Sequence, residues 1–374
     1  MNRAVLAGLL AAAAATPAGA QLFPAEGMTL RAEILADGLE HPWGIDFLPD
    51  GAALITERPG RLRIFEKGAL SEPVAGVPEV AVMGQGGLLD VLASSDFATS
   101  GTIFLTFSEA GPGGAGTAVA SAQLVREDGS ARLEDFTTLF SLEPKTEVGH
   151  HFGSRIVEAP DGTLFFSIGD RGEMDRAQDI ADPAGSVLRI NRDGSIPQDN
   201  PFVGREDAAP EIWSIGHRNI QGAVFDPLTK ALWTVEHGAR GGDEVNRPEA
   251  GKNYGWPVIA YGRHYSGMQI GRGTQAPGYE QPLYYWDPSI APSGMTVYEG
   301  SMFPEWQGDL LVAALKFELL ARLERDSSGE ILREDRLFEG VFGRLRDVEV
   351  APDGAVWLLT DAPDGKIIRV SRAK

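Results

Sequence analysis

The apolar positions of the chain recur in a repeated unit. Each unit has a turn that contains Gly or Pro, then a run of β-branched, leucine or aromatic residues, and then polar or charged residues. This order is typical of a hairpin that enters a buried strand. The unit occurs as "FLPDGAALITER" from Phe47, "SDFATSGTIFLTFSE" from Ser95, "EAPDGTLFFSIGD" from Glu158, "FDPLTKALWTVEHG" from Phe225, "FPEWQGDLLVAALK" from Phe303 and "VAPDGAVWLLTD" from Val350.

The spacing of these six units predicts the architecture. Helical periodicity is nearly absent after the first twenty residues, so the body of the chain reads as all-β. A repeat of this length cannot bury its own apolar face, and such repeats pack around a common axis. We therefore predict a six-bladed β-propeller that forms one domain over residues 21–374. A two-sheet sandwich is the alternative, but this chain is long for it.

The first twenty residues, "MNRAVLAGLLAAAAATPAGA", differ from the rest. They have a basic start, an Ala- and Leu-rich run and a small-residue end, which is the layout of a cleavable secretory signal. We predict a signal peptide over residues 1–20 and a periplasmic or secreted location; a buried N-terminal helix is the alternative. No other stretch approaches the roughly 20 apolar residues that a membrane span needs. The chain has no cysteine, so disulfides do not stabilise it.

The charge of the chain restricts its partners. The formal net charge is −20, from 53 acidic and 33 basic residues. Such a chain repels nucleic acid and anionic membranes, so neither is predicted as a partner. An acidic surface suits a cation with oxygen ligands such as Ca²⁺, although charge alone does not identify one.

Polar residues gather in glycine-flanked stretches that we interpret as ligand-facing loops. They are Gln85 in "MGQGGLLD", His150 and His151 in a turn that ends at Arg155, Arg218 and Asn219 in "GHRNIQG", "EHGARGGDE" from Glu236 with "NYGWP" following, and Lys316 with Arg344 and Arg346. Any one of these stretches is compatible with an ordinary turn. Together, the cations Arg218, Lys316, Arg344 and Arg346 indicate a polyanionic ligand. A nearby histidine would be suited to take a proton from a substrate hydroxyl.

These stretches resemble the soluble PQQ-dependent sugar dehydrogenases, specifically the aldose sugar dehydrogenase branch of the glucose/sorbosone dehydrogenase family. The resemblance runs from "GLEHPWGIDFLPDG" at Gly38 to Asp361. The motifs that carry it, in the family's order, are "GQGGLLD", "HFGSR", "IGDRG", "GHRNIQG", "EHGARGGDEVN", "GKNYGWP", "IAPSG", "LK" and "GRLRD".

The resemblance implies an oxidation of aldoses at C1 to lactones on a propeller that binds pyrroloquinoline quinone (PQQ) and Ca²⁺. His151 would act as the general base while hydride passes to C5 of PQQ, with Arg218 as a second catalytic residue, and electrons would pass to an external acceptor. The cofactor ligands that it implies are Gln85, Arg218, Asn219, Lys316, Arg344 and Arg346. The Ca²⁺ ligands that it implies are the carbonyls of Gly238 and Ala239 for a catalytic ion, with Glu244 and Tyr254 for a structural one.

The chain departs from the family pattern at three positions. Ala239 stands where Pro is common, Ser154 where Gly is usual, and His150 where the glucose-specialised branch has an acid that would orient the base. The long insertions of the dimeric glucose-specialised branch are absent, which favours a monomer. Two other functions remain open: a Ca²⁺-dependent propeller lactonase or gluconolactonase, and a non-catalytic propeller that binds a partner or glycan.

Overall fold

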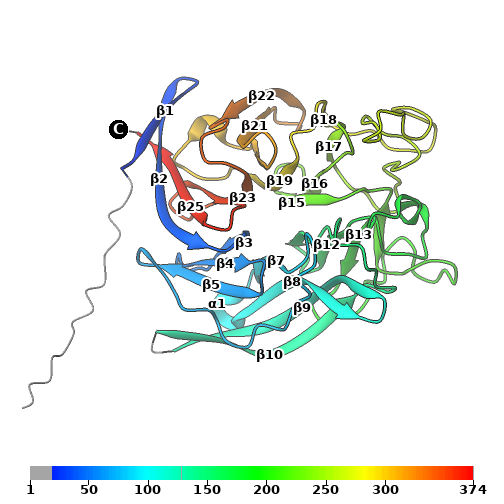
Figure 1. Cartoon of the computed structure of the whole chain (residues 1–374), viewed down its shortest axis with the longest axis horizontal. Coiled ribbons are helices and arrows are strands. Elements are labelled where there is room, and N and C mark those ends of the chain that lie inside the picture. Colours follow the sequence, from blue (N-terminus) through cyan, green and yellow to red (C-terminus); the bar gives the residue numbers. More distant parts are fainter. Residues whose placement is uncertain (1–18, 128, 374) are drawn as a thin grey trace, which may run out of the picture.

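The computed structural model of the protein describes residues 19–127 and 129–373, and within these ranges the chain is almost entirely sheet. Residues 1–18 of the predicted signal peptide lie outside the described residues. Six antiparallel sheets are arranged in a ring (Figure 1). The prediction of an all-β, six-bladed propeller is therefore confirmed.

Each blade is one sheet whose strands follow one another from the axis outward. The inner strands are β3 (Pro42–Phe47), β7 (Leu88–Ala93), β11 (Ile156–Glu158), β15 (Ile220–Asp226), β19 (Pro292–Val297) and β23 (Leu345–Val350). The second strands are β4 (Ala53–Glu57), β8 (Thr102–Gly111), β12 (Leu164–Ile168), β16 (Ala231–Glu236), β20 (Leu310–Ala314) and β24 (Val356–Thr360). The third strands are β5 (Arg61–Glu66), β9 (Gly114–Glu127), β13 (Ser186–Ile190), β17 (Asp243–Asn246), β21 (Leu319–Arg325) and β25 (Gly365–Arg372).

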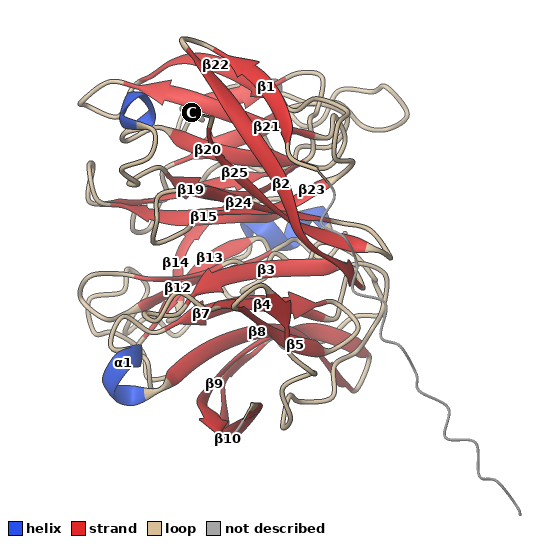
Figure 2. Ribbon diagram, turned by 90° about the vertical axis from the view of Figure 1, so that its left-hand side faces the viewer, coloured by secondary structure: helices blue, strands red, loops and turns tan. Residues whose placement is uncertain are grey.

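The outermost strands complete the blades, and one of them closes the ring. They are β6 (Ala69–Leu70), β10 (Ser130–Ser141), β14 (Ile212–Ile215), β18 (Tyr284–Trp286) and β22 (Ile331–Leu337), with β2 (Met28–Leu39) and β1 (Gln21–Ala25) in the last blade. β2 pairs with β25, so both ends of the described chain share one sheet (Figure 2). The helical elements among the described residues are short: α1 (Phe97–Ser100) and the 3-10 turns η1 (Met174–Gln178) and η2 (Pro304–Trp306).

The six sequence units are the hairpins between the first and second strands of the blades. Three of them share a "PDG" turn with the same local bonding. In the first blade, Gly51 has a φ of 86°, which glycine adopts without strain, and Asp50 Oδ1 accepts the Ala52 amide at 3.1 Å. The turns at Asp161 and Asp353 repeat this bond at 2.9 and 3.0 Å. The second strands that follow these turns are buried along their length.

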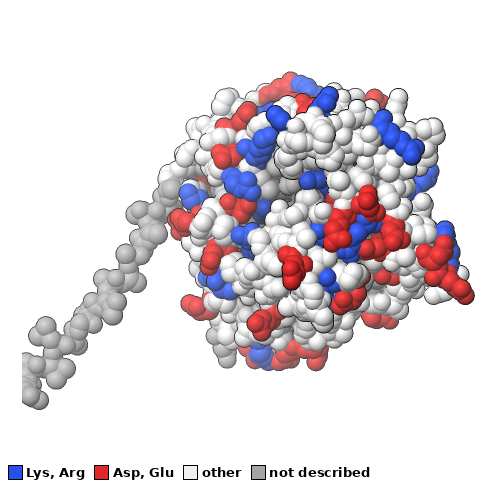
Figure 3. All heavy atoms as spheres, turned by 45° about the vertical axis from the view of Figure 1, so that its right-hand side comes forward, with Lys and Arg blue, Asp and Glu red and all other residues white. Residues whose placement is uncertain are grey.

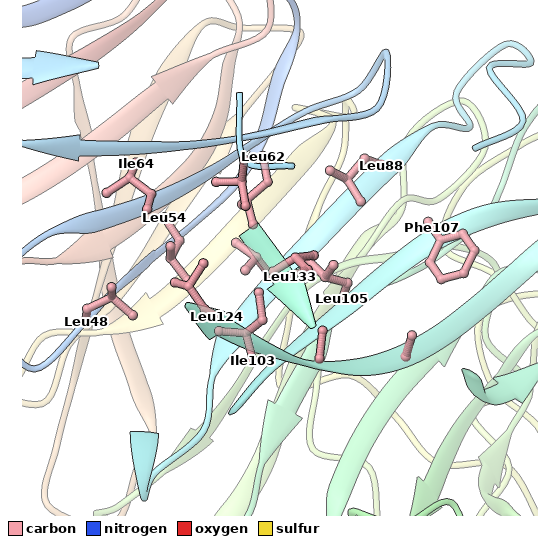
Figure 4. Packing of buried hydrophobic residues seen from close by; sticks show 14 of the residues in the cluster. Leu48, Leu54, Leu62, Ile64, Leu88, Ile103, Leu105, Phe107, Leu124 and Leu133 are labelled. Atoms are coloured by element: carbon pink, nitrogen blue, oxygen red, sulfur yellow. The ribbon is translucent and has the colours of Figure 1, made fainter. Parts of the chain in front are cut away.

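The core lies between the blades. One cluster packs the first blade against the second through Leu54, Leu62, Leu88, Ile103 and Leu105 (Figure 4). Similar clusters fill the other five interfaces between neighbouring blades. Each sheet is therefore stabilised by burying both faces against its neighbours.

Each inner strand leads into a hairpin, and the six hairpins lie at the same end of the axis. All six inner strands therefore run in the same direction along the axis. The connections that enter the inner strands, and those that join second to third strands, therefore meet at the opposite end. The predicted site residues Gln85, His151, Arg218, Lys316 and Arg344 all belong to these connections. The fold thus brings loops that are far apart in sequence to one end of the axis.

Candidate functional site

A cavity of about 270 Å³ lies where the six inner strands begin. Three of the predicted cofactor residues, Gln85, Arg344 and Arg346, line this cavity together with Trp43 and Asp361. In Figure 3, Lys and Arg side chains border a hollow near the centre of the face, and acidic side chains gather beside it. The site therefore combines an aromatic wall with concentrated positive charge in an acidic protein.

Arg344 and Arg346 converge on one carboxylate. Arg344 Nη2 donates to Asp361 Oδ2 at 3.0 Å, and Arg346 Nη2 donates to the same oxygen at 3.1 Å. Although burial opposes ionisation, Arg346, His41 and Arg344 hold the pKa of Asp361 well below its usual range. Two guanidinium groups and one carboxylate leave a net positive charge, and Arg346 Nε is buried without a hydrogen-bond partner among the described residues. The positive charge of the arginine pair can therefore attract an anionic ligand to the cavity.

His151 lies beside the cavity and is held by two neighbouring loops. Its amide donates to Gln85 Oε1 at 2.8 Å, and its ring Nδ1 donates to Asp170 Oδ1 at 2.6 Å. Because Asp170 accepts the Nδ1 proton, Nε2 carries the free lone pair of the neutral ring. Burial lowers the pKa of His151 below its ordinary value, although the hydrogen bond that the ring donates to Asp170 acts in the opposite direction. His151 is therefore neutral at pH 7 and able to accept a proton.

Asp170 is a site residue that the sequence analysis did not single out. It follows the buried strand β12 within "IGDRG", and its Oδ2 accepts Trp256 Nε1 at 2.8 Å. Burial opposes its ionisation, but the bonds from His151 and the Gly172 amide prevail, so the pKa of Asp170 is lowered. The signal in the sequence that could have identified Asp170 was an acidic residue two positions after the end of a buried strand. His150 stands where the glucose-specialised branch has an acid that would orient the base. In this protein Asp170 supplies that carboxylate instead.

Arg218 and Asn219 are fixed on the loop between β14 and β15. The Arg218 amide donates to Glu236 Oε2 at 2.6 Å, and its Nη1 donates to the Gly238 carbonyl at 2.5 Å. Asn219 Oδ1 accepts the Gly153 amide at 3.2 Å, next to His151 on the chain. The structure therefore places both residues against the loops that carry His151 and Gly238.

The Glu236 carboxylate that holds Arg218 also completes a Ser–His–Glu chain. Ser214 Oγ lies 2.9 Å from His217 Nε2, and His217 Nδ1 lies 2.8 Å from Glu236 Oε1. The distances match those of a hydrolase triad. All three residues are nevertheless buried, and Ser214 and His217 have no exposed surface. A substrate does not reach this serine, so the chain of bonds supports the Arg218 loop.

Lys316 differs from the other predicted cofactor residues. Its neighbour Leu315 lines the cavity, but Lys316 is exposed and does not belong to the described residues that line it. Its ammonium lies 5.3 Å from the centroid of the Phe317 ring. The structure thus brings Gln85, His151, Arg344 and Arg346 together and leaves Lys316 at the edge.

Gly238 and Ala239, the predicted ligands of a catalytic Ca²⁺, lie in a tight turn after β16. A Cβ on Gly238 would lie 2.2 Å from the Gly241 carbonyl oxygen and 2.3 Å from that of Gly242. Only glycine fits there, and the turn crowds several carbonyl oxygens together. Such oxygens are ligands that Ca²⁺ accepts.

Glu244 and Tyr254, the predicted ligands of a structural Ca²⁺, are linked through intervening residues. Glu244 Oε2 accepts Asn246 Nδ2 at 3.1 Å, and the same nitrogen donates to Glu236 at 3.0 Å. Tyr254 stacks on His217, whose ring is bonded to Glu236. Burial raises the pKa of Glu244 to about 8, and the charge of Glu236 adds to this effect. Among the described residues, no group of three or more His, Cys, Asp or Glu side chains is arranged to hold a metal.

The chain is similar to known sugar dehydrogenases in sequence and in fold. The chain is 44% identical over 349 residues to aldose sugar dehydrogenase YliI of Escherichia coli (strain K12), covering 92% of this chain and 93% of that protein. It superimposes on the apo crystal structure of the soluble E. coli aldose sugar dehydrogenase with a TM-score of 0.88, covering 92% of this chain and 100% of the other. The PQQ-bound aldose sugar dehydrogenase from Streptomyces coelicolor gives a TM-score of 0.76 at 28% identity, with coverage of 92% and 98%.

The sequence profile described as Glucose / Sorbosone dehydrogenase matches residues 39–369, which is nearly the whole propeller. No helix among the described residues has the length and apolar character needed to cross a membrane. From its motifs, its six blades and these similarities, the chain belongs to the glucose/sorbosone dehydrogenase family.

Proposed function

We propose that this sugar dehydrogenase oxidises aldoses at C1 to the corresponding lactones, with PQQ and Ca²⁺ as cofactors and an external electron acceptor. The observation that carries the proposal is the position of His151, whose free Nε2 belongs to a ring fixed by Asp170 beside a cavity lined by Arg344 and Arg346. The PQQ-bound relative from Streptomyces coelicolor supports the choice of cofactor.

The cavity suits a flat polyanion of the PQQ type. Trp43 provides an aromatic wall, and Arg344 and Arg346 provide positive charge. We assign the binding of PQQ to Gln85, Arg218, Asn219, Arg344 and Arg346, with Lys316 contributing from the edge. When bound, PQQ would supply the hydride acceptor, and Ca²⁺ would polarise it as a Lewis acid.

The residues also fit calcium in their donor chemistry. The carbonyls of the turn 238–242 supply neutral oxygens: those of Gly241 and Gly242 lie close to Gly238, and the Gly238 carbonyl accepts Arg218 Nη1. For the structural ion, Glu244 supplies a carboxylate, and Asn246 Oδ1 is a buried acceptor without a donor among the described residues. Tyr254 is the other ligand of this ion that the family resemblance implies.

The chain's own residues carry the proton. His151 Nε2 takes the proton of the sugar C1 hydroxyl, and Asp170 stabilises the imidazolium that forms. Arg218 lies 5.2 Å from the Trp256 ring centroid, and Trp256 in turn bonds to Asp170. Arg218 is therefore placed to offset negative charge that develops near the base.

The test is reconstitution of the apo-protein with PQQ and Ca²⁺. We expect dye reduction with a panel of aldoses, and the absorbance of the reduced cofactor after one sugar is added without dye. Hydrolysis of gluconolactone is measured in parallel. Lactone hydrolysis without dye reduction would favour the lactonase, and a failure to bind PQQ would favour a non-catalytic propeller.

Two further parts of the proposal concern the setting of the enzyme. We propose export through the segment 1–20 to the periplasm or the medium, and a monomeric state. Fractionation of the cells and sedimentation of the purified protein test these two points.

A further inference from the structure

Arg171 is a buried cation next to the predicted base. Its side chain is fully buried, and it forms no ion pair with the described residues. Burial lowers the pKa of Arg171 to about 10, and Arg176 adds to this effect, so the guanidinium stays charged at pH 7. A buried charge without a counterion is unfavourable unless its donors are satisfied.

Both Nη groups of Arg171 are directed at the segment that carries His151, whereas Nε has no partner among the described residues. Nη1 donates to the His150 carbonyl, and Nη2 donates to the Val148 carbonyl at 2.5 Å. The guanidinium also stacks on the Phe152 ring, 3.6 Å from its centroid. A planar fork that reaches two carbonyls and stacks on a ring is a geometry that Arg supplies and Lys does not.

The segment 148–152 needs such support because its backbone is strained. His151 has a φ of 59°, in the left-handed region that residues other than glycine rarely adopt. Gln85 donates its amide to the intervening Gly149 carbonyl at 2.7 Å. The carbonyls of residues 148, 149 and 150 are thus all held by two other loops.

We propose that Arg171 is a positioning residue for His151, acting by fixing the backbone of segment 148–152. Asp170 fixes the ring of His151, and the next residue on the chain fixes its backbone. The proposal rests on the proposed function for its effect on turnover, but its effect on the loop is measured in the apo-protein.

The test compares Arg171→Gln and Arg171→Lys with the same changes at Arg189. Arg189 is a matched control because it is also buried in the same blade, stacks near Trp213, and pairs with Asp161 and Asp199. Amide exchange of the peptide that covers residues 148–152 is followed by mass spectrometry without cofactor. We expect Arg171→Gln to accelerate this exchange about tenfold or more, and the Arg189 variants to leave it unchanged.

Turnover of the reconstituted enzyme gives the second readout. In Arg171→Gln we expect kcat to fall about 10- to 100-fold while the Kd for PQQ stays within about twofold of the wild type. Arg171→Lys should show a smaller increase in exchange and a smaller fall in kcat than Arg171→Gln. If Arg171→Gln does not fold, Arg171→Lys is compared with the wild type instead. Unchanged exchange in the 148–152 peptide, or equal effects from Arg189→Gln, would overturn the proposal. If the wild type oxidises no sugar, the exchange data still decide the role of Arg171.

Discussion

The two ends of the propeller axis are built from the same six strands and have opposite chemistry. The strands begin around the cavity of about 270 Å³ that holds Arg344 and Arg346. The same strands end around a second cavity of about 300 Å³, lined by Asp46, Asp90 and Glu349 among others. One end is cationic and the other is acidic, although the backbone architecture is shared.

The roles of the charges also differ between the two ends. In the acidic cavity, carboxylates join neighbouring blades: Asp46 accepts the Ala93 amide at 2.6 Å, and Asp90 accepts the Ile156 amide at 3.0 Å. In the cationic cavity, Arg344 lies on a loop and Arg346 lies at the start of β23, and both converge on Asp361. Carboxylates that accept amides of the next blade hold the ring together, whereas the arginine pair leaves a net positive charge beside the cavity that an anionic ligand can offset.

The largest expected effect is on turnover at the cationic end. His151→Gln removes the proposed base, and Asp170→Asn removes the carboxylate that orients it and stabilises its charged form. Each change should lower kcat of the reconstituted enzyme by about 10²- to 10⁴-fold. Urea unfolding should show a change in stability below about 2 kcal/mol in either variant. Retained turnover in His151→Gln would show that the base is a different residue.

At the acidic end, the expected effect is on stability. Arg155 lies between Asp90 and Asp347, with Nη1 2.9 Å from Asp90 Oδ1 and Nη2 2.9 Å from Asp347 Oδ1. Arg155→Met leaves two buried carboxylates without their cation, so the free energy of unfolding should fall by about 3–5 kcal/mol. Urea denaturation at pH 7 measures this loss. A loss below about 1 kcal/mol would mean that the ion pairs of Arg155 with Asp90 and Asp347 do not hold the blades together.

The affinity for PQQ should distinguish two predicted ligands within the cationic end. Arg346 is buried and lines the cavity, so Arg346→Ala should weaken PQQ binding about 10- to 100-fold, the range for a hydrogen bond to a charged group. Lys316 is exposed, so Lys316→Ala should weaken it less than about fivefold. Quenching of tryptophan fluorescence during titration of the apo-protein with PQQ gives both constants. Equal losses would place Lys316 in the cavity when the cofactor is bound.

The sequence predicted the blades because their signals are local. A "PDG" turn followed by a buried strand is written in about ten consecutive residues, and the structure has a hairpin at every such unit. The partners of the site residues are set by tertiary structure. Asp170 reaches His151 across 19 positions, and Asp361 reaches Arg346 across 15. No local pattern encodes these pairs, so Asp170, Arg171 and Asp361 were missed. The sequence also grouped Lys316 with Arg344 and Arg346, but only the two arginines line the cavity.

The smallest expected effect is on pH dependence, and its sign differs between the two ends. Because burial lowers the pKa of His151, the base stays neutral to a pH below its ordinary value of about 6.5. Turnover should therefore be independent of pH from about 8 to 6.5 and fall as the pH drops through the lowered pKa. A profile of kcat against pH measures this fall. An acid limb centred above about 6.5 would contradict the burial of the ring.

At the acidic end, burial raises the pKa of Glu349 to about 8, and the neighbouring Asp46 charge adds to the rise. The folded state therefore binds this proton more tightly than the unfolded state, where the pKa is about 4.3. Its contribution to stability is complete below pH 4.3 and is lost as the pH rises through about 8. The Glu349→Gln variant has no group that ionises at this position. The free energy of unfolding of the variant minus that of the wild type should therefore be larger at about pH 9 than at about pH 4, by about 1 kcal/mol or more. A difference that is equal at both pH values would mean that folding does not shift the pKa of Glu349, as for a carboxyl on the surface of the protein.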